Sequence, residues 1–183
     1  GFDAAHHVHA ARARMSGLVE QTGFYPAWTG LENLQALGRL AGMTRATART
    51  EAARAFGLVG LEHAQAKPVR AYSMGMRQRL GLAQALLGRP AYILLDEPTN
   101  GLDPEGIADI RNVLRKLQHD EGATILLSSH QLHEITDLCD VIGVMRQGRM
   151  VLEADAATLL SAHGRHRIVA DGGAATVRAL EVL

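Results

Sequence analysis

The chain has 183 residues, of which 47% are hydrophobic and 21% charged, so it can form a domain with a core and is not a disordered chain. Nineteen basic residues balance nineteen acidic ones, which argues against nucleic acid or anionic lipid as the main partner. The single cysteine, Cys139, excludes a disulfide framework within the chain and a zinc site built on cysteines. Neither a membrane-spanning apolar run nor a secretory signal is present, so we expect a soluble, cytoplasmic protein.

The first half of the sequence is mainly helical in pattern. Residues 17–20 form a short apolar segment that suits a strand, and a turn-rich passage follows over 21–30. Helical spacing of apolar residues then predicts three stretches, at 34–41, 44–56 and 74–87. Thr44 is placed to cap the second of them.

The second half changes to strand-like patterns. Three unbroken apolar runs predict strands buried on both faces of a sheet, at 91–95, 123–127 and 141–145. A helical pattern over 109–118 separates the first two runs, and strand–helix–strand in this order predicts a parallel sheet of the α/β class. Residues 147–149 are typical of a hairpin turn.

Two adjacent carboxylates, Asp96 and Glu97, directly follow the first apolar run. Ligands of open parallel sheets bind beyond the carboxyl ends of the strands. One carboxylate there can help to hold Mg²⁺ while the other accepts a proton from water. Taken alone, the pattern is equally compatible with a strand that emerges into solvent.

Other polar positions also allow both a chemical and a structural interpretation. His130 follows the second run, where an imidazole could reach a bound phosphate, although an exposed or capping histidine is the commoner case. Asp103 precedes Pro104 and is a candidate helix N-cap. Ser73 and Gly75 open a helix and could form an anion site, but an ordinary capped helix has the same residues.

Taken together, these segments resemble a known family. Five of them follow the order of motifs in the ATP-binding cassette (ABC) ATPases: the passage after the Q-loop (23–34), the signature motif (72–80), the Walker B strand (92–99), the D-loop (100–104) and the switch histidine (129–130). By this alignment Glu20 takes the Q-loop position. The resemblance covers about residues 10 to 153.

The resemblance implies a partial P-loop NTPase core, with a parallel sheet and an α-helical subdomain, that uses ATP and Mg²⁺. Asp96 would help to hold the metal, and Glu97 would polarise the attacking water. His130 would contact the γ-phosphate, while Glu20 would lie near the metal and couple the site to a partner.

The resemblance also implies partners. In the family, the residues matching Ser73 and Gly75 close over ATP held by the opposite subunit, and the residue matching Asp103 communicates across that interface. We therefore expect a second nucleotide-binding subunit in a homodimer, together with a separate transmembrane permease subunit. This places the chain in the cytoplasm, peripherally on the inner face of the cell membrane, with no nucleic acid partner.

The sequence departs from the family pattern in several places. The phosphate-binding Walker A loop, G-x-x-x-x-G-K-S/T, is absent, and neither Lys67 nor Lys116 belongs to one. Only 19 residues precede Glu20, so we expect the family's amino-terminal strands to be missing and tight ATP binding to be lost. Met74 and Met76 stand where glycine and glutamine are usual, as in other bacterial export ATPases. Glu20 at the Q-loop position and the segment 23–26 resemble the bacteriocin and multidrug export branch.

We expect residues 1–183 to form a single incomplete nucleotide-binding domain of an ATP-hydrolysing export subunit. Its predicted parts are a helical signature subdomain (23–89), a core with Walker B, D-loop and switch histidine (90–153) and the start of a carboxy-terminal extension (154–183). Two alternatives remain open. One is a non-hydrolysing subunit that completes a partner's ATP site, and the other is a soluble ABC ATPase acting on ribosomes or DNA.

Overall fold

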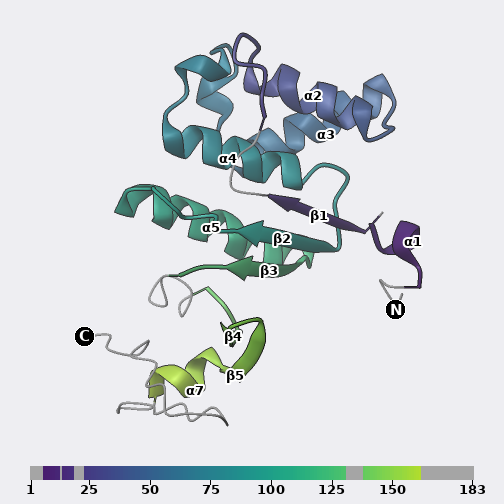
Figure 1. Ribbon diagram of the computed structural model, residues 1–183. Helices are drawn as coiled ribbons and strands as arrows, with labels where there is room; N and C mark the ends of the chain where they lie inside the picture. Colours follow the sequence, from purple (N-terminus) through teal and green to yellow (C-terminus); the bar gives the residue numbers. More distant parts are fainter. Residues whose placement is uncertain (1–5, 13, 19–22, 131–137, 162–183) are drawn as a thin grey trace. The chain divides into compact units, whose positions relative to one another are not determined.

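The computed structural model describes residues 6–12, 14–18, 23–130 and 138–161 (Figure 1). They belong to two compact units, residues 1–128 and 129–183, each of which is described by itself. The first unit opens with the short helix α1, Val8–Arg12.

Three helices and two short 3₁₀ turns form a helical region within the first unit. The elements are α2 (Gly30–Leu40), α3 (Arg45–Leu58), η1 (Glu62–Ala64), η2 (Val69–Ala71) and α4 (Met74–Ala85). The side chains of Thr29, Thr44 and Ser73 cap the three α-helices by accepting a hydrogen bond from a backbone N–H three residues later. The three predicted helical stretches and the cap at Thr44 are therefore confirmed.

The core of the helical region is tightly packed. Leu34, Phe56 and Leu80 are at most 1% exposed. A Cβ added at Gly30 would lie 2.7 Å from the hydroxyl oxygen of Tyr72 and 2.8 Å from Cε2 of Phe56. This close approach of α2 to its neighbours requires a residue without a side chain at position 30.

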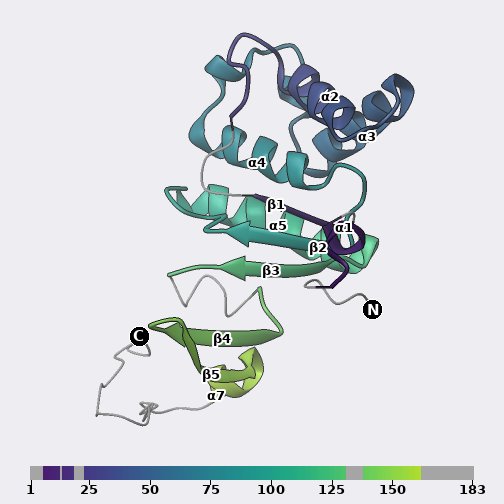
Figure 2. The ribbon, with the colours of Figure 1, turned by 45° about the vertical axis from the view of Figure 1, so that its right-hand side comes forward.

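A three-stranded parallel sheet forms the rest of the described first unit. Its strands are β1 (Met15–Leu18), β2 (Tyr92–Asp96) and β3 (Thr124–Ser128), in the order β1-β2-β3. Helix α5 (Pro104–Glu121) connects β2 to β3 and lies against the sheet (Figures 1 and 2). The predicted parallel strand–helix–strand unit is confirmed. The first strand ends at Leu18, and residues 19–20 of the predicted strand lie outside the described residues.

The two faces of this sheet differ in burial. Ile93 and Leu95 are 1% and 2% exposed, whereas Leu94 and Leu126, which are paired across β2 and β3, are 38% and 66% exposed. The expectation that these runs are buried on both faces is therefore wrong. An apolar run shows that a strand is hydrophobic, but burial also needs an element that covers each face, and no described element of the first unit covers Leu94 and Leu126.

The second unit contains an antiparallel hairpin. Strands β4 (Val141–Arg146) and β5 (Arg149–Asp155) are joined by Gln147 and Gly148, which both have positive φ, as tight hairpin turns require. The turn predicted at this position is confirmed. Helix α7 (Ala156–Ser161) follows directly, and residues 162–183 lie outside the described residues.

Within the described ranges, no helix combines the length and the hydropathy that crossing a bilayer requires.

Candidate functional site

The carboxyl ends of β2 and β3 bring two carboxylates and a hydroxyl together. The parallel register pairs Asp96 with Ser128, and the Ser128 hydroxyl donates a hydrogen bond of 2.6 Å to Oδ1 of Asp96. The same hydroxyl accepts a hydrogen bond of 3.1 Å from the backbone N–H of Glu97. One side chain of β3 therefore orients both acidic residues that end β2.

Glu97 has an unusual backbone conformation. Its φ is +48°, in the left-handed region that residues other than glycine rarely adopt. Such a conformation costs about 1–3 kcal/mol and is retained where the surrounding structure fixes it, often at functional sites. Here the Ser128 hydroxyl binds the Glu97 N–H, and the Glu97 carbonyl accepts a 3.1 Å hydrogen bond from the Asn100 N–H. The half-buried Glu97 is therefore held in a turn at the edge of the sheet.

The loop after Glu97 leads into a capped helix. Thr99 is 5% exposed, and its carbonyl accepts a hydrogen bond of 3.2 Å from the Leu102 N–H. Gly101 has a φ of +72°, which glycine adopts without strain. Oδ1 of Asp103 accepts a 2.9 Å hydrogen bond from the Gly106 N–H, so the predicted N-cap of α5 is confirmed. A role of Asp103 across a subunit interface stays a prediction.

The start of α4 packs against this loop in the same chain. Nε2 of Gln78 donates a 2.9 Å hydrogen bond to the Pro98 carbonyl. A Cβ added at Gly101 would lie only 2.4 Å from Cε of Met74, the end of a flexible and exposed side chain that can move away, so it is the positive φ that requires glycine there. The segments that resemble the signature motif and the D-loop are thus in direct contact.

Ser73 and Gly75 lie at the first turn of α4. Oγ of Ser73 accepts a 3.2 Å hydrogen bond from the Met76 N–H, which confirms the structural interpretation as a helix cap. Ser73 is exposed and Gly75 half-buried. Their proposed contact with a nucleotide on another subunit stays a prediction.

Two further residues, Glu20 and His130, are predicted to belong to the site. Glu20 lies outside the described residues. His130 is exposed and belongs to the second compact unit, so its relation to Asp96 and Glu97 also stays a prediction.

The sequence pattern predicts no role for Ser128 or Gln78. Ser128 ends an apolar run, as Asp96 does, and the predicted parallel pairing of the two runs was the signal that could have found it. Gln78 carries no such signal, since its partner is a backbone carbonyl 20 residues away.

The side chains at the carboxyl ends of β2 and β3 fit part of a magnesium–nucleotide site. Magnesium is usually held by one or two carboxylates, together with waters and substrate phosphates. Asp96 and Ser128 offer oxygen ligands of this kind, and no group of three or more metal-binding side chains occurs among the described residues. The residues therefore suit an open magnesium site that depends on a phosphate ligand, while the chain's sequence lacks the loop that would cradle the phosphates.

Comparison with known proteins identifies the family. Residues 3–100, more than half of the chain, match the family model described as "ABC transporter". The chain belongs to this family. The resemblance inferred from the five sequence motifs is thereby confirmed.

Similar proteins agree with this assignment. The chain is 42% identical to the bacitracin transport ATP-binding protein BcrA of Enterococcus faecalis, over 91% of the chain and 52% of that protein. It is 34% identical to the lantibiotic transport ATP-binding protein SrtF of Streptococcus pyogenes, over 78% and 60% respectively. The chain thus spans about half the length of the curated relatives that it matches.

A solved structure supports the fold. The cbiO1 protein of Clostridium perfringens, described as part of the ABC transporter complex cbiONQ, superposes with a TM-score of 0.75 at 25% identity. The match covers 82% of this ABC family chain and 61% of that protein. The predicted fold class, an α/β ABC ATPase core with a parallel sheet and helices, is confirmed.

Proposed function

We propose that this chain is part of the ATP-hydrolysing subunit of an ABC exporter. The observation that carries the proposal is the Asp96–Ser128–Glu97 arrangement at the carboxyl edge of a parallel sheet, with Glu97 held at a positive φ. Relatives named as ATP-binding proteins of bacitracin and lantibiotic transport support a role in transport.

In this proposal the two carboxylates have different tasks. Asp96, oriented by Ser128, helps to hold Mg²⁺, and Glu97 accepts a proton from the attacking water. Bound Mg²⁺ would neutralise charge that develops on the phosphate oxygens. The Glu97 backbone N–H donates a hydrogen bond to the Ser128 hydroxyl, which fixes the Glu97 backbone directly beside Asp96.

The remaining predicted residues act between subunits or with partners. Ser73 and Gly75 contact the nucleotide of a second copy, and Asp103 contacts that copy through the D-loop. His130 contacts the γ-phosphate, and Glu20 couples the site to the partner. The domain division stated above, with a helical signature subdomain at 23–89, belongs to the same proposal.

A separate transmembrane subunit completes the transporter in this proposal, with the ATPase subunits bound to it on the inner face of the membrane. ATP binding would bring two subunits together, and hydrolysis would separate them. The names of the relatives, which are ATP-binding proteins of transport systems, support this partner.

The decisive experiment is the Glu97→Gln variant of the full gene product assembled with its membrane subunit. We expect ATP turnover to fall by about 100-fold or more, because a positioned general base contributes about 10²–10⁴-fold. ATP binding, measured by equilibrium dialysis, should persist. Glu105→Gln is the matched control, since it removes an exposed glutamate from the first turn of α5. Unchanged turnover in Glu97→Gln would contradict the role of Glu97.

A second candidate function is favoured by the start of α4, where Ser73 is exposed and Gly75 is only half-buried, as contact with a nucleotide on another subunit requires. The chain would then complete a partner's ATP site through Ser73 and Gly75 and hydrolyse no ATP itself. In that case the Glu97→Gln substitution would not affect turnover of the mixed complex, whereas Ser73→Ala would reduce it. The two substitutions therefore distinguish the two functions.

A further inference from the structure

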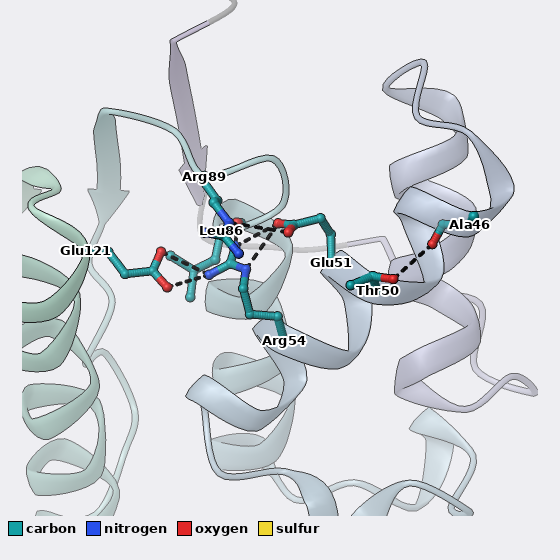
Figure 3. A network of polar contacts seen from close by, with 7 residues as sticks. All are labelled: Ala46, Thr50, Glu51, Arg54, Leu86, Arg89 and Glu121. Carbon is teal, nitrogen blue, oxygen red and sulfur yellow. Dashed lines mark hydrogen bonds and ion pairs between the residues drawn. The ribbon is translucent and has the colours of Figure 1, made fainter.

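The chain returns from the helical region to the sheet through a short connection surrounded by charged side chains. Gly88 and Arg89 of this connection both have positive φ, at +78° and +53°. Beside it lie Glu51 and Arg54 of α3 and Glu121 at the end of α5, as Figure 3 shows. These four charged residues, Glu51, Arg54, Arg89 and Glu121, are here called the return cluster. None of them belongs to the site described above.

Arg54 is the centre of the return cluster. Its guanidinium group donates to both carboxylate oxygens of Glu121, at 2.6 and 2.9 Å, and to Oε2 of Glu51, at 2.9 and 3.1 Å. It also donates a 2.7 Å hydrogen bond to the carbonyl of Leu86, just after α4. One planar guanidinium group thus joins α3, the end of α4 and the end of α5 (Figure 3).

The return cluster is partly shielded from water. The side chains of Arg54, Glu51 and Glu121 are 16%, 13% and 26% exposed. Burial by itself raises the pKa of Glu51, but the hydrogen bonds and charges of Arg54 and Arg89 outweigh it and hold this pKa below the usual value. Glu51 is therefore charged at neutral pH, and its ion pair with Arg54 lies in surroundings where ion pairs are stronger than at an open surface.

Helix formation does not explain Glu121. A negative charge at the last residue of a helix opposes the helix dipole. The helix is already ended by Gly122, whose φ is +63° and whose N–H donates to the Leu117 carbonyl. Glu121 instead accepts hydrogen bonds from Arg54, which lies 67 residues away in the sequence.

We propose that Arg54 is a positioning residue that fixes the direction of α4, and hence of Ser73 and Gly75, relative to the sheet. This role rests on the proposed function. The twelve-residue helix α4 is about 18 Å long, so a tilt of about 10° at its Leu86 end moves its Ser73 end by about 3 Å. A displacement of about 1 Å can already cost about 100-fold in a catalytic site.

The first test measures orientation and needs no ATP hydrolysis. Nitroxide labels are attached to the full chain at Arg77→Cys on α4 and Lys116→Cys on α5, in a Cys139→Ser background, since both positions are exposed. We expect Glu121→Gln to broaden the electron–electron distance distribution, because α5 loses its ionic contact with Arg54. Asp120→Asn, which removes an exposed carboxylate one residue away, should leave the distribution unchanged. Equal distributions in the two variants would overturn the proposal.

Arg54→Lys provides an independent variant. It keeps the positive charge but loses the planar group that reaches three partners, so the distribution should broaden as in Glu121→Gln. Circular dichroism of each variant checks that the helices are formed. If Arg54→Lys fails to fold, the comparison of Glu121→Gln with Asp120→Asn still tests the proposal.

The second test links orientation to activity in the assembled transporter. When only a fraction of the molecules holds α4 in the competent orientation, the apparent affinity for ATP is the intrinsic affinity multiplied by that fraction. For Glu121→Gln we expect a KM for ATP raised by about three- to tenfold and a kcat close to that of Asp120→Asn. A KM equal to the control would overturn the link to α4. Absence of turnover in the wild type would instead contradict the proposed function and leave the label result standing.

Discussion

The helical region and the sheet use their apolar residues in different ways. In the helical region the large side chains of Leu34, Phe56 and Leu80 are at most 1% exposed, and each α-helix is capped by a residue that directly precedes it. In the sheet, Ile93 is 1% exposed, whereas Leu126 is 66% exposed. The helical region thus builds a closed core from neighbouring segments, while the sheet is buried on one face only among the described residues.

The difference shows how far an apolar pattern determines burial. The helices at 30–85 follow each other closely and pack mainly on each other. The sheet instead joins β1 to β2, whose paired residues Met15 and Tyr92 are 77 positions apart. A face of such a sheet is covered only if some other segment reaches it. Burial therefore follows from local pattern in the first case and from distant partners in the second.

The largest expected effect concerns Phe56. Phe56→Ala should lower the free energy of unfolding by about 3–5 kcal/mol, because it removes a fully buried ring and leaves a cavity. Leu126→Ala should change it by only about 0.5 kcal/mol or less, since that side chain is mostly exposed. Urea unfolding followed by circular dichroism measures both. Similar losses in the two variants would mean that the exposed face is covered in solution.

A smaller effect is expected at Gly30. Gly30→Ala should lower the free energy of unfolding by about 1–3 kcal/mol, because the added Cβ meets Tyr72 and Phe56 at less than 3.0 Å. Alanine is otherwise the better helix former, so a loss identifies the close packing as its cause. The control is Gly23→Ala, where nothing lies within 4 Å of the added Cβ. A stabilised Gly30→Ala variant would show that the helical region can expand locally.

The smallest effect is expected at the cap of α2. Thr29→Ala should cost about 1 kcal/mol at neutral pH, and Thr29→Ser should restore most of it. Hydrogen bonds from the Thr29 backbone N–H and hydroxyl lower the pKa of Glu32, so this part of the cap is present above the usual value of 4.5 and is lost as the pH falls through the lower, folded-state pKa. Unfolding curves at neutral and acidic pH measure the change. A cost of Thr29→Ala that does not decrease in acid would contradict the role of Glu32.

The sequence by itself determined the family and much of the local structure. Five motifs in a fixed order identified the ABC family, and the caps at Thr44 and Asp103 and the turn at 147–148 followed from residue types. The parallel connection from β2 to β3 followed from strand–helix–strand order. These features depend on neighbours within one element or one crossover, so short-range patterns are enough to predict them.

Only the tertiary structure decided the contacts between distant segments. The Ser128 hydroxyl at Asp96 and Glu97 depends on the register of β2 and β3, and the exposure of Leu94 and Leu126 depends on which elements cover the sheet. The contact of Arg54 with Glu121 depends on the packing of α3 beside the end of α5. No spacing in the sequence encodes such contacts, because each arises from where whole elements come to lie in the folded chain.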